Sequence, residues 1–193
     1  MHSNSTSGRI KIKNVGYLNN TEGGLEGEPG LYYDYIMAGN GLFIRAKSPL
    51  LQATVQIAES RVRGLLPLVG KVELLKGKIP QYLYNLAFSV LLLDRTQECY
   101  LAVTWDGGYL LKEPRQDATS SEVSYDRLPS TILDIHSHGC IRAFFSITDD
   151  QDEQGLRLYM VAGRLDTLIP DLKLRVGVYG YFSPIKFEDV FSV

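Results

Sequence analysis

The sequence has little of several features that mark particular classes of protein. Only two cysteines occur in 193 residues, Cys99 and Cys140. This excludes the dense pattern of a secreted disulfide scaffold and favours a reducing compartment. The longest apolar stretch, residues 86–93, is far short of the roughly twenty residues that a membrane-spanning helix needs. No signal-peptide pattern opens the sequence. We therefore expect a cytoplasmic protein that does not insert into a membrane.

Neither sign of charge is in excess. Twenty basic and twenty-two acidic residues give a net charge of -2 at pH 7, so overall electrostatics do not predict a polyanionic partner. A basic strip at residues 61–78 contains one acidic residue, Glu73. Association of this strip with DNA is the weaker interpretation, and a solvated face of a β-rich element is the favoured one. Nucleic acid is not expected as a ligand.

Turn signals and hydrophobic periodicity divide the chain near residue 78. Residues 1–78 are expected to form a β-rich N-terminal extension or small domain, with a hairpin at Asn40-Gly41 and a loop at residues 19–30. The second part, residues 79–193, begins with a helix after Pro80. A hairpin around residues 106–108, a strand, a short helix and two more strands follow, the last alternating apolar with basic residues. The predicted fold class is α+β.

Two of the three histidines lie in one short segment. His136 and His138 are two residues apart on an expected buried strand, so their imidazoles project from the same face. Ser146 and Asp149 are three residues apart at the start of an expected helix and share a helical face. A turn through the seven intervening residues can bring two nitrogens and a carboxylate oxygen together. Such a set suits Zn²⁺, with a fourth position left for water.

Ser146 and Asp149 also have a structural interpretation. Ser-x-x-Asp before an acidic first turn is typical of a helix capping box, in which each residue bonds the backbone of the other. Capping alone does not account for His136 and His138, because an unsatisfied imidazole on a buried strand costs free energy. The sequence therefore favours a metal site and leaves the cap open as a second role.

Three residues near the histidines have expected roles of their own. Asp134 shares their strand face and can either orient an imidazole or cap a neighbouring strand. Gly139 permits a tight turn out of the strand. Cys140 can serve as a spare ligand or a redox brake, but a small buried side chain is the favoured interpretation.

The spacing His136-x-His138, seven residues, Ser146, two residues, Asp149 resembles the H-x-H-x7-S-x-x-D motif of the JAB/MPN family, also called JAMM metallopeptidases. The segment "AFFSITDDQDE" is similar to the prokaryotic branch, particularly component A of the bacterial ParB-related, ThiF-related cassette. The resemblance covers residues 79–193. It implies an MPN/JAB-like, cytidine-deaminase-like domain in which helices flank a mixed β-sheet.

The resemblance also implies a catalytic site. One Zn²⁺ per chain would be held by His136, His138 and Asp149, and Ser146 would donate a hydrogen bond to the oxyanion. Amidohydrolase-like sites that begin with His-x-His are excluded, because no histidine follows His138. Zinc deaminases are excluded because the chain has no Pro-Cys-x-x-Cys.

A glutamate completes the set that the resemblance implies. It is expected after the first helix of the domain, where Glu98 precedes an apolar strand, and it would act as general acid and base. The Gly-rich pattern that often follows this glutamate in the family is absent, since Tyr100 and Leu101 stand there. Glu113 and Glu122 are the alternative candidates for this general acid and base.

The implied activity is hydrolysis of a peptide or isopeptide amide bond by a zinc metallopeptidase. The substrate would be the C-terminus of a ubiquitin-like or sulfur-carrier-like protein, and a ThiF/E1-like protein would be a partner. The alternative is a non-catalytic MPN-type scaffold that binds a protein partner. Residues 1–78 lie outside the motif and are expected to recognise a partner, occlude the site or mediate a homodimer.

Overall fold

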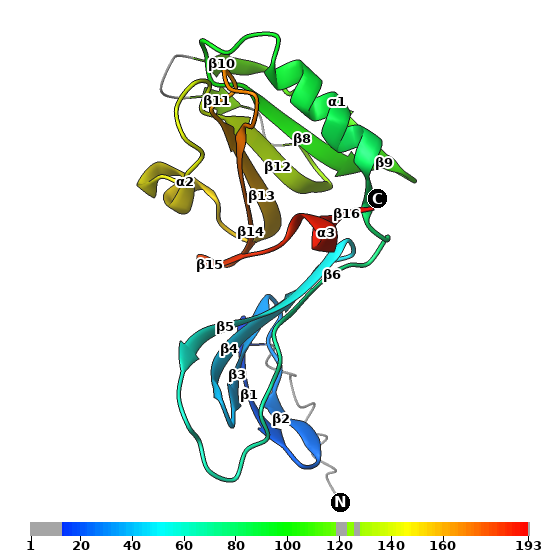
Figure 1. Ribbon diagram of the computed structural model, residues 1–193. Coiled ribbons are helices and arrows are strands. Elements are labelled where there is room, and N and C mark those ends of the chain that lie inside the picture. The colour runs from blue at the N-terminus through cyan, green and yellow to red at the C-terminus, as the bar shows by residue number, and fades with distance from the viewer. Residues whose placement is uncertain (1–12, 119–122, 126–127, 193) are drawn as a thin grey trace, which may run out of the picture.

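The computed structural model describes residues 13–118, 123–125 and 128–192 (Figure 1). Strands account for 47% of the structure and helices for 12%, and most strands lie in two six-stranded sheets. Among the described residues, no helix has both the length and the apolar character needed to cross a membrane. The third histidine, His2, and Glu122, one of the alternatives to Glu98, lie outside the described residues.

The first sheet has the strand order β2-β1-β3-β4-β5-β6. Its strands are β1 (Val15–Thr21), β2 (Gly24–Glu28), β3 (Tyr33–Ala38), β4 (Gly41–Lys47), β5 (Leu51–Glu59) and β6 (Lys71–Leu74). The hairpin predicted at Asn40-Gly41 is confirmed and joins β3 to β4. The loop predicted at residues 19–30 is wrong, because β1 and β2 pair there. All of β2 is exposed, so no buried alternation marked it in the sequence.

The second sheet has the strand order β15-β14-β13-β12-β8-β9. Its strands are β8 (Tyr100–Trp105), β9 (Tyr109–Lys112), β12 (Thr131–Ser137), β13 (Leu156–Gly163), β14 (Asp171–Val178) and β15 (Tyr181–Pro184). The predicted helix after Pro80 is confirmed as α1 (Gln81–Leu91), and β8 and β9 form the predicted hairpin. Strand β12 runs parallel to β13 and antiparallel to β8, so the sheet is mixed.

Short elements complete the fold. They are β7 (Ile79–Pro80), α2 (Ile147–Asp152), α3 (Phe187–Val190), β16 (Phe191–Ser192) and a small ribbon of β10 (Gln116–Ala118) with β11 (Val123–Tyr125). The ribbon lies between β9 and β12 in the chain.

The predicted helix-flanked α+β fold of the MPN/JAB type is wrong. The described residues contain three helices, of which α2 and α3 have only six and four residues. Side chains of the first sheet complete the main core together with α1. These apolar side chains, including Ile44 and Leu51, join the same core as those of the second sheet. The result is a mostly β architecture with large mixed sheets.

One face of the second sheet forms the main core. Alternate residues of its strands, such as Leu133, Ile135 and Met160, pack with Leu83 of α1 and with the first sheet. The opposite face carries α2 (Figure 1). The first sheet and residues 79–193 share this core, and the domain boundary at residue 78 stays a prediction.

Candidate metal centre

Strand β12 places a histidine on the face of the sheet that α2 covers. All seven residues of β12 are buried. Because side chains alternate along a strand, Leu133 and Ile135 enter the main core while Asp134 and His136 project to the other face. His138 follows directly after β12 on the same alternation.

Three side chains converge at the end of this strand. Ligand atoms of His136, His138 and Asp149 all lie within 4.8 Å of one another. Within the described part of the chain, this is the one group of three or more such residues that can hold a metal ion. His136 is buried, and His138 and Asp149 are partly buried. The structure thus brings together the three ligands that the sequence predicted.

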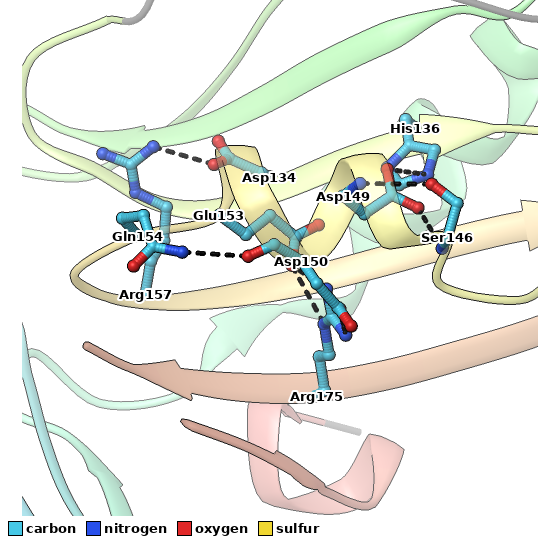
Figure 2. A network of polar contacts seen from close by, with 9 residues as sticks. All are labelled: Asp134, His136, Ser146, Asp149, Asp150, Glu153, Gln154, Arg157 and Arg175. Carbon is cyan, nitrogen blue, oxygen red and sulfur yellow. Dashed lines mark hydrogen bonds and ion pairs between the residues drawn. The ribbon is translucent and has the colours of Figure 1, made fainter. Parts of the chain in front are cut away.

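Ser146 and Asp149 form the predicted capping box at the start of α2. The Asp149 backbone N–H donates to Ser146 Oγ (3.1 Å), and the Ser146 backbone N–H donates to Asp149 Oδ2 (2.5 Å). The other carboxylate oxygen, Asp149 Oδ1, faces His136 Nε2 at 3.5 Å (Figure 2). The cap therefore fixes the carboxylate through one oxygen and leaves the second for a metal, so the two interpretations are compatible.

His136 is held as a neutral imidazole with an unsatisfied nitrogen. Among the described residues, no hydrogen-bond partner reaches its buried Nε2. Burial lowers the pKa of His136 from 6.5 to about 4, and this outweighs the opposing effect of Asp149. A neutral imidazole is the form that coordinates metals. An unpaired buried nitrogen costs free energy, so a ligand for this atom would relieve that cost.

His138 is oriented by the backbone. Its Nδ1 lies 3.3 Å from the carbonyl oxygen of Arg142. Because a carbonyl can only accept, Nδ1 carries the hydrogen in this contact, and Nε2 keeps its lone pair. Metal-binding histidines commonly have their second nitrogen fixed in this way.

The turn after β12 depends on two glycines. Gly139 has φ +54°, a conformation that L side chains rarely adopt, and a Cβ there would lie 2.4 Å from the Arg95 carbonyl oxygen. A Cβ on Gly163 would lie 2.3 Å from the Ala143 nitrogen. The turn therefore packs against the ends of neighbouring segments, which holds the loop between His138 and Ser146 in place. The tight turn predicted at Gly139 is confirmed.

Arg175 fixes α2 to the sheet, and the sequence did not identify it. In the alternation along β14 it resembled an exposed polar residue, but it is 7% exposed. Its Nε donates to Glu153 Oε2 (2.9 Å) and its Nη1 to Asp150 Oδ1 (2.6 Å) (Figure 2). The guanidinium carbon lies 3.7 Å and 3.8 Å from the ring centroids of Phe145 and Phe182. The residue pattern of a single strand does not reveal a cation that is buried between two aromatic rings of other segments.

Glu153 is the buried partner of Arg175. Burial raises the pKa of Glu153 to about 8, although Arg175 acts in the opposite direction. Its backbone N–H also donates to the carbonyl oxygen of Asp149 (2.8 Å). The Arg175–Glu153 pair therefore connects β14 to Asp149, the predicted carboxylate ligand.

Asp134 bonds residues of the two neighbouring strands, and Cys140 differs from its favoured sequence interpretation. Asp134 accepts hydrogen bonds from Tyr100 and Arg157, the latter at 2.7 Å, in place of orienting an imidazole. Cys140 is exposed rather than buried. The metal-binding group does not include it.

Glu98 lies two residues before β8, near the end of the pairing between β8 and β12. In the antiparallel pairing of β12 and β8, His136 lies opposite Tyr100, and the Ser137 N–H donates to the Cys99 carbonyl (3.0 Å). Continued beyond the paired residues, this register would set Glu98 opposite His138. Residues opposite each other share a sheet face. The role of Glu98 stays a prediction, and this position supports it.

Other residues weighed from the sequence lie elsewhere. Glu113 is exposed just after β9, and β8 separates β9 from β12. In the basic strip, Lys71 pairs with Glu73 (2.7 Å) and Lys78 donates to the Glu188 carbonyl (2.6 Å).

Comparisons with known proteins give the chain no family. No protein-family model matches it, and a search of curated proteins found no match.

Proposed function

We propose that the protein is a zinc-dependent metallopeptidase that hydrolyses a peptide or isopeptide amide bond. The observation that carries the proposal is the convergence of His136, His138 and Asp149 within 4.8 Å around a buried imidazole nitrogen that lacks a hydrogen-bond partner among the described residues. The JAMM-like spacing of the same residues agrees with this chemistry.

The donor set fits zinc. Two neutral imidazoles and one carboxylate are the ligands of many catalytic zinc sites, which leave a fourth position for water. Harder cations such as Mg²⁺ and Ca²⁺ prefer oxygen ligands. The carboxylate oxygen Asp149 Oδ2 is already occupied by the Ser146 N–H, so Asp149 offers one oxygen.

The surrounding residues supply the acid-base and oxyanion chemistry. When bound, Zn²⁺ would supply a Lewis acid able to lower the pKa of water from 15.7 to about 7. Glu98 would accept a proton from the attacking water and deliver it to the leaving amine. Ser146 Oγ accepts the capping hydrogen bond, so its own O–H stays available to donate to the carbonyl oxygen of the scissile amide.

The proposed substrate is the C-terminal region of a ubiquitin-like or sulfur-carrier-like protein, with a ThiF/E1-like protein as partner. We place the protein in the cytoplasm, and the free thiols of Cys99 and Cys140 agree with a reducing compartment.

Metal analysis and cleavage assays test the proposal together. Purified protein is expected to bind one zinc per chain, to lose it in His138→Ala and to retain it in Glu98→Gln. Cleavage of a panel of ubiquitin-like fusion proteins is expected to disappear in both variants. Asp152→Asn, which changes an exposed carboxylate of α2 outside the metal group, is the matched control and is expected to keep zinc and activity.

Two results would contradict the proposal in different ways. If the protein does not bind stoichiometric zinc after incubation with the metal, the proposed metal centre is contradicted. Stoichiometric zinc with no cleavage of any amide substrate would support the non-catalytic scaffold that binds a protein partner.

A further inference from the structure

We propose that a basic pocket beside the metal centre binds a carboxylate of the substrate. The inference rests on the proposed function and adds a substrate class to it: peptides or protein tails that carry an acidic group a few residues from the scissile bond. The pocket has a volume of about 190 Å³ and is lined by Arg142, Ala143, Arg164, Asp171, Leu172 and Lys173.

The charges of this pocket are unbalanced. Three cationic side chains line it, against the single carboxylate of Asp171. Asp171 lies 3.5 Å from Arg164 Nε. Among the described residues, neither Arg142 nor Lys173 forms an ion pair. Arginine and lysine side chains that converge on a concave surface favour an anionic ligand.

The strand register places the pocket next to the metal centre. Lys173 pairs with Val161, and Val161 pairs with His136, so the three residues form one row on the same face of the sheet. Strands lie roughly 4.8 Å apart, which puts the backbones of Lys173 and His136 about 10 Å apart. Arg142 is closer, because its carbonyl contacts His138.

This separation defines where the acidic group must lie. An extended chain advances about 3.3 Å per residue. A peptide whose scissile amide lies at the metal centre would therefore reach the pocket about two to four residues away.

The backbone of Arg164 is held in an uncommon conformation. Its φ is +51°, a region that bulky residues rarely occupy and where glycine would be less strained. The Arg164 N–H donates to the Ile141 carbonyl (2.7 Å), and the Thr167 N–H donates to the Arg164 carbonyl (3.0 Å). These bonds hold the arginine at the pocket in spite of the strain, as expected of a functional side chain.

Selection from peptide libraries tests the pocket without requiring cleavage. Zinc-loaded Glu98→Gln protein is immobilised and exposed to random nine-residue libraries. One has a fixed Glu and blocked ends, one has Gln at that position and blocked ends, and one has Gln and a free C-terminal carboxylate. Retained peptides are measured by mass spectrometry in 50 mM and 500 mM NaCl.

We expect about tenfold enrichment of a carboxylate-bearing library over the blocked Gln library, with a loss of enrichment in high salt. The Glu library and the free-carboxylate library distinguish a side-chain acid from a chain terminus. In Arg142→Gln/Lys173→Gln the enrichment should vanish while zinc content is unchanged. The control Lys112→Gln/Arg115→Gln removes the same charge from two exposed cations outside the pocket.

Equal retention of the three libraries would contradict the proposal that the pocket binds a carboxylate. Equal loss of enrichment in both double variants would contradict it as well. Zinc content and cleavage are measured separately, so that result leaves the metallopeptidase proposal standing. Selective retention of acidic peptides by protein that binds no zinc would instead support the proposed carboxylate-binding pocket and contradict the metallopeptidase proposal.

Discussion

The two faces of the second sheet are built from the same strands but have different roles. The inner face is apolar and packs against α1 and the first sheet. The outer face carries Asp134, His136 and Arg175, all 9% exposed or less. Residues one position apart, such as Ile135 and His136, therefore have opposite environments. The comparison shows how a rigid apolar layer can support buried polar groups that would destabilise a protein on their own.

The largest difference between the faces is expected from Arg175. Arg175→Met removes the hydrogen-bond donors of the buried Glu153 carboxyl and of Asp150 together with the cation between Phe145 and Phe182, which should lower the free energy of unfolding by about 3–5 kcal/mol. Zinc affinity should fall as well, because α2 carries Asp149. Urea unfolding and zinc titration measure the two effects. Lys173→Met, an exposed neighbour on β14, should change stability by less than about 0.5 kcal/mol. An unchanged zinc affinity in folded Arg175→Met would show that the pair does not position the ligand.

On the inner face, Ile135→Ala should cost about 2–5 kcal/mol, because it opens a cavity among fully buried side chains. The folded fraction should still bind zinc stoichiometrically. Urea unfolding followed by metal analysis of the folded fraction checks both expectations. Loss of zinc from folded Ile135→Ala would mean that the two faces are not separable.

The smallest effect concerns His136 itself. Its folded pKa of about 4 lies below the ordinary value of 6.5, so the unfolded chain binds the proton first. Stability is then present above pH 6.5 and lost as the pH falls toward 4, by about 3 kcal/mol in metal-free protein. His136→Leu should remove this dependence. At neutral pH it should also raise stability by about 1–3 kcal/mol, because no buried nitrogen stays unsatisfied.

Unfolding of both proteins in the presence of a chelator, from pH 4 to 7.5, measures this difference. Other titrating groups are common to the two proteins and cancel in the comparison. A His136→Leu curve parallel to that of the original protein would contradict the assigned environment.

Some of the fold was predictable because it depends on local patterns. The hairpin at Asn40-Gly41 and α1 after Pro80 follow from turn chemistry and helical periodicity. The pairing of β1 with β2 was missed, since an exposed strand has no buried alternation. The prediction of flanking helices was wrong because no local pattern in residues 1–78 indicates that side chains of their sheet will join the core of the second sheet.

The candidate site divides in the same way. The shared face of His136 and His138 and the cap formed by Ser146 and Asp149 follow from spacings of two and three residues. Arg175 could not be found, because its ring and carboxylate partners come from β15, from α2 and the residue after it, and from the loop before α2.

The sequence by itself determined which side chains share a strand face and which cap a helix, because these relations repeat with the period of the backbone. Only the tertiary structure decided that the first sheet completes the core, that Arg175 is buried and that a basic pocket lies beside the histidines. The reason is physical: such contacts depend on which strands become neighbours, and that choice is made by burial over the whole chain.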